Sequence, residues 1–484
     1  MRRDTPIFGG LVVVAVVLSF VTGSTASSRP ARSPGTAPVV AQTLICPVVN
    51  GVPSHTTSTA TVIDLGAALP TPRHGTGTIT STVLLGSKST TAMLKAAPSA
   101  SVSSRQGTSE SVAFTSEGTI SSSLAAGALI ETTDGRYRAL AGGACLPPAT
   151  DWWFAGGNGN IGFTDRLWLA NAAPTDAVVA VTLWTPTGPS SSPRLSAIRV
   201  PARSQVRVGI FAVAPDISTV AMHVHADSGA VTAAITDRRT SGLDSNGGDL
   251  VAPTVPPSRQ LVINGFPSGA GSRGLVVSNP GSSDATVSVR VATPNGEYTP
   301  SSLTNFVVGP GRAAALDVTK ALGSLPGAVI LSSDHPIIAA GQASITPSGR
   351  RLRPDFVWLA ATKPLTEPSA VAIGHEPDGG NCYLLVTAPE AAGTVRITTP
   401  SGGSRTISVP AGHSIQVDIT ATIKSGNGPW PFVVTSTGSG PVYVARELHF
   451  LGAHGELVTT EPVTALPLPI DLPTVRADAR LAVR

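Results

Sequence analysis

Apolar and polar residues alternate with a period of two along most of this chain, in short runs that end at turns containing proline or glycine. Successive side chains of a β-strand point to opposite faces of its sheet, so this period is typical of strands with one face on a core. Long, charged amphipathic helices are nearly absent. The pattern predicts an all-β fold.

Three copies of one pattern, each about a hundred residues long, fill the last two-thirds of the sequence. Each copy contains a Thr-Pro-x-Gly turn, and the three prolines are 108 and 106 residues apart. Proline fixes φ and glycine permits φ > 0, which suits a turn that ends a strand. In each copy, the positions two, four and six before the threonine form one face of the preceding strand: Leu183, Val181 and Val179; Val291, Val289 and Val287; Ile397, Val395 and Gly393.

A second block follows each turn and aligns without a gap. Val200, Val308 and Val409 each precede a Pro/Gly kink, and apolar residues return six, eight and ten positions later. About seven short strands per copy favour an antiparallel sandwich of immunoglobulin-like type. A propeller built of four-stranded blades fits less well, because each copy holds too many strands and the repeat is too long.

The predicted fold is therefore a row of tandem immunoglobulin-like antiparallel β-sandwiches after an N-terminal export or anchor helix. The predicted divisions are a signal peptide or single transmembrane anchor at 1–26, a Ser/Pro/Arg-rich tether at 27–42, an N-terminal β domain at 43–149, sandwich repeats at 150–248, 257–350 and 366–464, and an extended tail at 465–484.

The region before the repeats also has strand patterns, although it does not align with them. Thr57–Leu65 and Gly75–Leu85 read as strands, and Asp134-Gly135 between two apolar runs predicts a hairpin. The serine-rich stretch Ser99–Ser109 reads as a loop. We interpret this region as a separate β domain.

The N-terminus has the features of an export signal. Arg2 and Arg3 precede the uncharged apolar run Pro6–Val21, and Ser24-Thr25-Ala26 offers a small-residue cleavage site. The same run is also long enough to remain as a short membrane span. Both outcomes place the rest of the chain outside the cytoplasm, either anchored by the N-terminal helix or secreted after cleavage.

Charge and cysteine content agree with an exported protein. The 484 residues are 41% hydrophobic and only 13% charged, and the net charge of +4 is spread thinly without a basic run among aromatics, so nucleic-acid binding is not expected. In an oxidising compartment Cys46 and Cys145 are the predicted disulfide, closing the N-terminal β domain. Cys382 begins a strand and is expected to be a small buried side chain.

No reactive motif stands out, and we expect no catalytic residue, cofactor or metal. His223, His225 and Asp227 share one strand face and could bind zinc or copper, but a solvated strand face explains them as well. Gly157–Gly162 matches G-x-G-x-x-G, yet a strand pattern follows where a dinucleotide site needs a helix. Glu376 and Asp378 read as loop residues.

Tryptophans gather in the first repeat. Exposed aromatic rings can stack on sugars, so Trp153, Trp168 and Trp184 are candidate ligand-binding residues. A tryptophan in a β-sandwich more often fills a core or an interface.

The combination of an export segment, a tether, Cys46-Pro47, Cys145-Leu146-Pro147 and Trp152–Gly157 resembles an actinobacterial exported-protein family of unknown function. This resemblance implies an envelope protein and brings no catalytic residues. The leading hypothesis is a non-enzymatic cell-envelope scaffold or interaction module whose partner is an envelope protein or a wall polymer. The alternative is a glycan- or cell-wall-binding protein that uses the aromatics of the first repeat.

Overall fold

The computed structural model describes residues 36–471 except 47–55, 95–98, 106–109, 191, 348, 350–351, 374–379, 425–429 and 468–469. The predicted export segment at 1–26, most of the tether at 27–42, the loop with Glu376 and Asp378 and most of the tail at 465–484 lie outside the described residues. Within the described part, no helix has both the length and the apolar character needed to cross a membrane.

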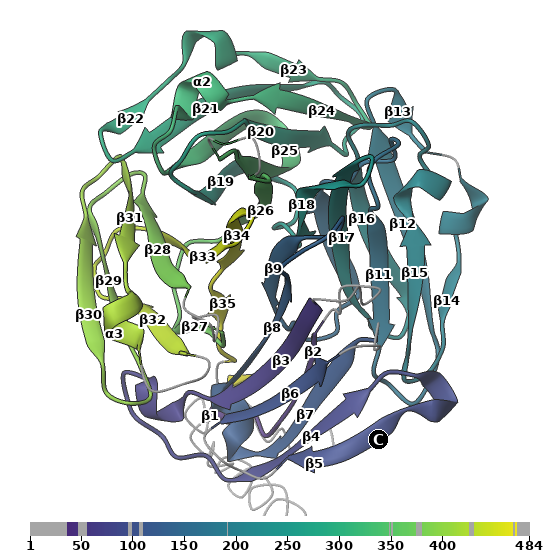
Figure 1. Ribbon diagram of the computed structural model, residues 1–484, viewed down its shortest axis with the longest axis vertical. Helices are drawn as coiled ribbons and strands as arrows, with labels where there is room; N and C mark the ends of the chain where they lie inside the picture. The colour runs from purple at the N-terminus through teal and green to yellow at the C-terminus, as the bar shows by residue number, and fades with distance from the viewer. Residues whose placement is uncertain are drawn as a thin grey trace, which may run out of the picture. The chain divides into compact units, whose positions relative to one another are not determined.

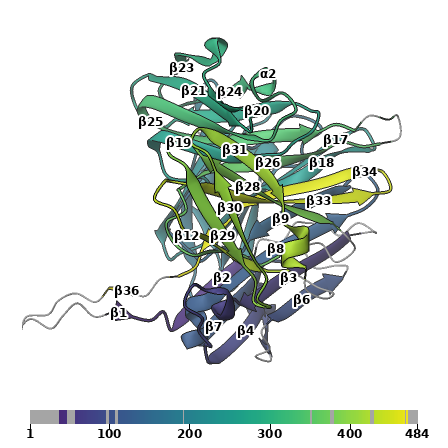
Figure 2. The same cartoon turned by 90° about the vertical axis from the view of Figure 1, so that its left-hand side faces the viewer.

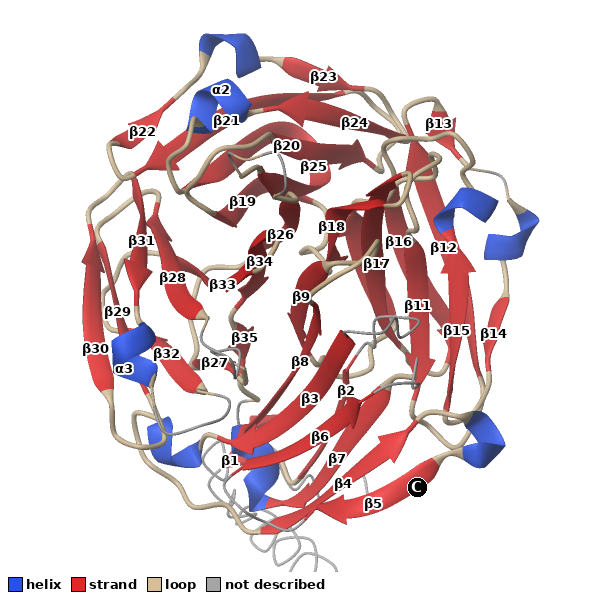
Figure 3. Cartoon of the chain, in the orientation of Figure 1, coloured by secondary structure: helices blue, strands red, loops and turns tan. Residues whose placement is uncertain are grey.

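The fold is all-β, as predicted, and short helices only connect strands (Figure 3). Two compact units are present. In one, β1 (Thr36–Ala37) pairs with β36 (Ile470–Asp471). The other, Val39–Leu468, is the main body and contains all that follows. Its helices are α2 (Thr319–Leu322), α3 (Thr420–Ile423) and the 3-10 turns η1 (Gly66–Ala68), η2 (Gly86–Lys88), η3 (Thr119–Ser123), η4 (Pro193–Leu195), η5 (Ile210–Ala212) and η6 (Ser301–Leu303).

The main body consists of four pairs of antiparallel sheets, which we call lobes 1 to 4 (Figure 1). Lobe 1 contains β2 (Ala41–Cys46), β3 (Thr56–Asp64), β4 (Gly77–Val83), β5 (Thr90–Leu94), β6 (Ser99–Arg105), β7 (Val112–Gly118), β8 (Leu124–Thr132) and β9 (Ala139–Ala144). Lobe 2 contains β10 (Asp151–Ala155), β11 (Arg166–Asn171), β12 (Ala177–Thr185), β13 (Gly188–Pro189), β14 (Ile198–Val200), β15 (Ser204–Gly209), β16 (Ala221–Ser228), β17 (Thr232–Ser241) and β18 (Asp244–Val251).

The last two lobes follow the same plan. Lobe 3 contains β19 (Ser258–Phe266), β20 (Arg273–Asn279), β21 (Ala285–Thr293), β22 (Gly296–Tyr298), β23 (Phe306–Val308), β24 (Arg312–Asp317), β25 (Gly327–Ile345) and β26 (Asp355–Thr362). Lobe 4 contains β27 (Ser369–Val371), β28 (Asn381–Ala388), β29 (Gly393–Thr398), β30 (Ser404–Val409), β31 (His413–Asp418), β32 (Phe432–Ser436), β33 (Tyr443–Gly452), β34 (Gly455–Pro462) and β35 (Thr464–Ala465).

All four lobes share one strand order. When the main strands of a lobe are numbered along the chain, one sheet has the order 1-6-3-4 and the other 5-2-7-8, so each lobe has eight main strands and not the seven expected. In lobe 3 the long strand β25 supplies both the sixth and the seventh, because its first half pairs with β19 and β21 and its second half with β20 and β26. The polar stretch at Asp334 lies inside this continuous strand.

Lobe 1 corrects two expectations from the sequence. It is a fourth copy of the repeated topology, although its sequence does not align with the other three. Ser99–Ser109 was expected to be a loop, but its first part is strand β6, which pairs with β3 over seven residues. Strand propensity is a weak guide where a neighbouring strand offers a complete set of hydrogen-bond partners.

Each of the three aligned copies buries its predicted face in its own core. Val179, Val287 and Val395 are all fully buried, and they belong to three separate apolar clusters. The turn threonine is buried too, and its Oγ1 accepts from the main-chain N–H two residues on in the first two copies, at 3.2 Å in both Thr185 and Thr293. The glycine that closes each turn has positive φ. The repeated motif therefore ends a core strand with a turn held by its own side chain.

The lobes close on one another around the second-sheet edge strands β9, β18, β26 and β34, which surround the middle of the main body in Figure 1. β9 lies against β18 and β34, and β26 lies against the same two strands. Figure 2 shows the hairpin of β33 and β34 side-on, in yellow. Apolar clusters shared between lobes cover the same junctions, for example Leu129 and Leu140 with Leu448 and Leu457.

Cys46 and Cys145 form the predicted disulfide, and Cys382 is buried and free. The bond joins β2 to the end of lobe 1 across 99 residues of sequence. We expect the double variant Cys46→Ser/Cys145→Ser to lose roughly 4–5 kcal/mol of unfolding free energy, because the unfolded chain regains the freedom of a long loop. Urea denaturation with and without reductant measures this loss. Cys382→Ala is the control, and it should remain as sensitive to reductant as the wild type.

Candidate functional site

The centre of the main body is built around the carboxylate of Asp355, the first residue of β26. It is fully buried and accepts main-chain N–H bonds from the three other lobes: Leu140 at 3.4 Å, Gly248 at 3.2 Å and Val458 at 3.1 Å. These donors lie on edge strands, whose N–H groups would otherwise be left without partners away from water. Gly247 is required beside them, because it has φ of +98° and an added Cβ would lie 2.4 Å from Asp355 Oδ1.

Asp249 on β18 makes a second junction among the same four edge strands. Its Oδ2 accepts from the Trp358 main-chain N–H at 2.8 Å, and its Oδ1 accepts from Thr459 Oγ1 at 3.1 Å. Thr459 Oγ1 in turn accepts from the Gly142 N–H at 3.0 Å. This junction therefore also connects all four lobes.

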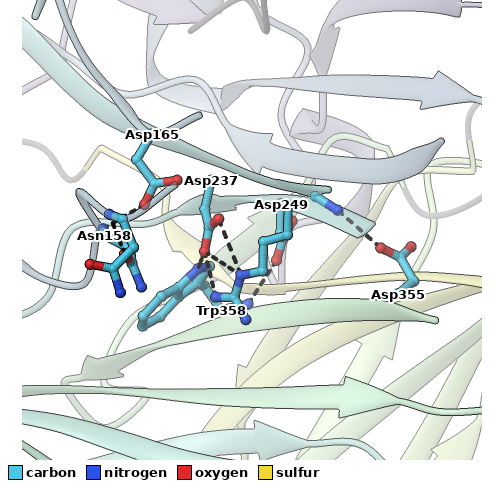
Figure 4. Close-up of polar contacts among 9 residues, drawn as sticks. Asn158, Asp165, Asp237, Asp249, Asp355 and Trp358 are labelled. Carbon is cyan, nitrogen blue, oxygen red and sulfur yellow. Dashed lines mark hydrogen bonds and ion pairs between the residues drawn. The ribbon is translucent and has the colours of Figure 1, made fainter. Parts of the chain in front are cut away.

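A third group lies where lobe 2 meets lobe 3. Asp237 Oδ2 accepts from Trp358 Nε1 at 2.9 Å and from Arg239 Nη2 at 2.5 Å, and the Arg239 guanidinium lies 3.9 Å from the Phe356 ring centre. Asp165 neighbours Asp237 and accepts from the Asn158 N–H at 2.7 Å. We call Asp165, Asp237, Asp249 and Asp355 the central carboxylate network (Figure 4).

Burial dominates the electrostatics of this network. Removal from water disfavours the charged form, so it raises the pKa of Asp355 to about 7 despite its N–H donors and the nearby Arg138. Burial also raises the pKa values of Asp249 and Asp165 well above their usual range, and for Asp165 the neighbouring Asp237 adds to the rise. Every carboxylate oxygen of this network accepts a hydrogen bond from a protein donor except Asp165 Oδ1, which is buried without a partner among the described residues.

A second cluster lies on the surface of lobe 2, where β10 and β16 pair. The register places Asp151 opposite His225 and Trp153 opposite His223. Asp151 Oδ1 lies 2.9 Å from His223 Nε2 and 2.8 Å from His225 Nδ1. We call Asp151, His223 and His225 the lobe 2 histidine cluster. Among the described residues, these three are the only His, Cys, Asp or Glu side chains that converge closely enough to hold a metal ion.

Contacts within the cluster and partial burial shift the pKa values of all three members. The hydrogen bond from His225 is the main cause that lowers the pKa of Asp151 to about 2, and the same bond raises the pKa of His225. Partial burial lowers the pKa of His223, which stacks on Trp153 with ring centres 3.8 Å apart. Asp151 therefore remains a carboxylate throughout the physiological range.

The candidate tryptophans have different surroundings. Trp168 is 1% exposed and its Nε1 donates to Thr236 Oγ1 at 3.3 Å, while Trp184 is 6% exposed. Trp153 is half-buried, and one face of its ring is covered by His223. Two of the three rings are therefore buried, and the third is partly covered by a stacked imidazole.

The other chemical candidates are structural or undescribed. Gly157–Gly162 is a loop between β10 and β11 with no helix after it, and its Asn158 N–H binds Asp165. Asp227, on the same strand face as the histidines, is exposed, with Oδ1 4.0 Å from His225 Nε2.

Sequence reasoning missed Asp151 and the whole central network. Asp151 starts a strand 72 residues before His223, and only the pairing of β10 with β16 brings the two together. The central carboxylates left one trace in the sequence. Asp249 and Asp355 each adjoin an apolar run, Leu250-Val251 and Phe356–Leu359, where a charged side chain is rarely buried unless it is paired.

Fold and site thus define an all-β protein of four interlocked sheet pairs with a carboxylate-rich centre. The sequence profile of DUF5719, a family of unknown function, matches residues 96–420, about two-thirds of the chain, and the chain belongs to this family. The expected membership of a family of unknown function is confirmed.

Comparison with individual proteins adds little. No curated protein matches the chain. Seven solved chains match. One of them, from Thermotoga maritima (Crystal Structure of Thermotoga maritima 1070), is 13% identical, covers 22% of this chain and 96% of its own length, and has a TM-score of 0.19, which is too low to establish a shared fold.

The pKa of Asp355 predicts an unusual dependence of stability on pH. The folded state binds a proton that the unfolded state releases near pH 4, so the free energy of unfolding should fall as pH rises from about 4 to about 7, by roughly 4 kcal/mol for this group. Urea denaturation at constant ionic strength between pH 4.5 and 7.5 measures the slope. A stability that rises across this window would contradict the prediction.

Replacement of Asp355 tests its role directly. Asp355→Asn puts an amide NH₂ where main-chain N–H groups need an acceptor, so it should cost about 1–3 kcal/mol in unfolding free energy at pH 7. It should also flatten the pH dependence, because the amide does not titrate. Asp284→Asn, at an exposed position of lobe 3, is the control and should leave both quantities unchanged.

Proposed function

We propose that this chain is a non-enzymatic, extracytoplasmic scaffold that presents a rigid four-lobe body to a partner in the cell envelope. One observation carries the proposal: buried carboxylates bond the edge strands of four repeated lobes to one another. The four lobes therefore act as one rigid body. Modules joined flexibly in a row would not need buried hydrogen bonds between their edge strands.

The connections between lobes support rigidity. In the segment between lobes 2 and 3, the Thr254 N–H bonds the Trp153 carbonyl at 2.8 Å and Thr254 Oγ1 donates to the Ala339 carbonyl at 2.9 Å. Between lobes 3 and 4, the Leu365 N–H bonds the Val442 carbonyl at 2.7 Å. Connections held by such hydrogen bonds fix the orientation of one lobe relative to the next, which suits a scaffold that holds a partner in one geometry.

The disulfide and the N-terminal sequence support the proposed location outside the cytoplasm. A bond between Cys46 and Cys145 persists in oxidising surroundings and is rare in the cytosol. The basic and apolar segment at 1–26 supplies an export route, with retention as an anchor or release after cleavage as its two outcomes. The partner we propose is an envelope protein or a wall polymer.

The glycan-binding alternative through Trp153, Trp168 and Trp184 receives no support from the side-chain positions. A sugar ring stacks on an aromatic face that it can reach, and two of these rings are buried while the third is covered on one face. A scaffold surface elsewhere on the main body is compatible with either class of envelope partner.

Fractionation and crosslinking in the native host test the proposal. We expect the full-length chain outside the cytoplasm with Cys46 and Cys145 oxidised, as shown by non-reducing peptide mass spectrometry. Crosslinking in intact cells, followed by mass spectrometry, should recover one reproducible envelope partner. The proposal is overturned if the chain is cytoplasmic with reduced cysteines. It is equally overturned if the purified chain turns over a wall-derived or ester substrate and loses this activity on a single substitution.

A further inference from the structure

The repeated fold does not require histidines at positions 223 and 225. Strand register gives the equivalent positions in lobe 3. His225 pairs with Ala180 in lobe 2, and the equivalent pair in lobe 3 is Ser332 with Ser288. His223 pairs with Thr182, and the equivalent pair in lobe 3 is Ile330 with Arg290. The same strand face thus folds with serine and isoleucine in lobe 3. Asp151 likewise corresponds to Gln260, which pairs with Ser332.

We propose that Asp151, His223 and His225 form a binding site for a divalent transition-metal ion of the zinc and copper class. The donor set of two imidazoles and one carboxylate is the type that such ions select. All three side chains project from the same face of two paired strands, and their ligand atoms lie within 4.8 Å of one another. This inference stands independently of the scaffold function.

The surroundings hold the ligands in place before an ion arrives. The Trp153 ring lies nearly parallel to the His223 ring, at 9°, and restricts how that imidazole turns. Thr150 Oγ1 donates to Asp151 Oδ2 at 2.9 Å, which leaves Oδ1 directed at the two imidazoles. Asp227 Oδ1, 4.0 Å from His225 Nε2, is positioned as the outer carboxylate that commonly orients a metal-bound histidine.

Metal binding requires that two ring protons move. In the metal-free cluster, His223 Nε2 and His225 Nδ1 each form a hydrogen bond with Asp151 Oδ1. When the ion takes the place of these two hydrogens, the proton of each neutral ring moves to its other nitrogen, which for His225 is the one beside Asp227. Side-chain exposures of 21%, 46% and 48% for His223, Asp151 and His225 leave the outer side of the ion open to water or to an external ligand.

Metal titration of the full-length chain tests the site. Isothermal titration with Zn²⁺ in a non-chelating buffer should show one site, and His223→Ala and His225→Ala should each weaken it by at least about tenfold, since even outer-shell changes cost 10–100-fold. Mg²⁺ should not compete, because it prefers oxygen ligands. His335→Ala is the matched control: this partly exposed histidine has one neighbouring carboxylate, Asp334, at 3.2 Å from its Nδ1, and its loss should leave zinc binding unchanged.

Tryptophan fluorescence gives a readout that a purely structural role of the histidines would not produce. Cu²⁺ bound at His223 lies next to the Trp153 ring and should quench its emission. Trp153→Phe should lose most of this quenching and retain zinc binding, since phenylalanine preserves the stack. Circular dichroism of each variant verifies folding. Equal zinc affinity in the wild type and the His223→Ala/His225→Ala double variant would overturn the proposal, as would Cu²⁺ quenching that is unchanged by Trp153→Phe.

Discussion

The hydrogen bonds from three lobes to the carboxylate of Asp355 are the constraint on which the main body depends. The second sheet of each lobe ends in an edge strand, and edge strands bring unpaired N–H groups to any surface that covers them. Apolar packing alone would bury these groups at a cost of about 1–3 kcal/mol each. One side chain with two acceptor oxygens satisfies donors on β9, β18 and β34 at once. Asp249 and Thr459 make further hydrogen bonds of this kind between the same edge strands.

The same centre explains why the repeats tolerate different surfaces. The core of each lobe is set by alternating valines, isoleucines and leucines, and the lobes contact one another through shared apolar clusters and a few buried polar groups at one edge of one sheet. The strand faces away from these cores can therefore differ between lobes, and lobe 2 has two histidines where lobe 3 has Ser332 and Ile330. Function in this architecture is expected to reside on one lobe and not to recur with the repeat.

The features that local sequence patterns determine, the core strands and their turns, were predicted from the sequence. Strands before the Thr-Pro-x-Gly turns were predictable because Val179, Val287 and Val395 fall at the same offset from a turn with its own chemistry. Lobe 1 was not recognised as a copy, since its strands are rich in Thr, Ser, Ala and Gly and no shared turn fixes the alignment. Of the histidine cluster, the alternation of His223 and His225 was visible, but Asp151 depends on strand pairing across 72 residues. The central carboxylates depend on contacts between lobes, which no local pattern encodes.

The closed order of the lobes has a consequence for how the protein is made. Lobe 1 is synthesised first and packs against lobe 4, which is synthesised last. A nascent chain that has emerged only as far as β26 already contains Asp355, but the Val458 donor and the hydroxyl of Thr459 have yet to leave the ribosome. Each lobe can form its own core as it is synthesised, whereas the hydrogen bonds at the centre of the main body are complete only when the final hairpin of β33 and β34 is in place. Completion of the polypeptide, and not the folding of any one repeat, therefore completes the centre, and termination before β34 would leave Asp355 without the Val458 donor and Asp249 without the Thr459 hydroxyl.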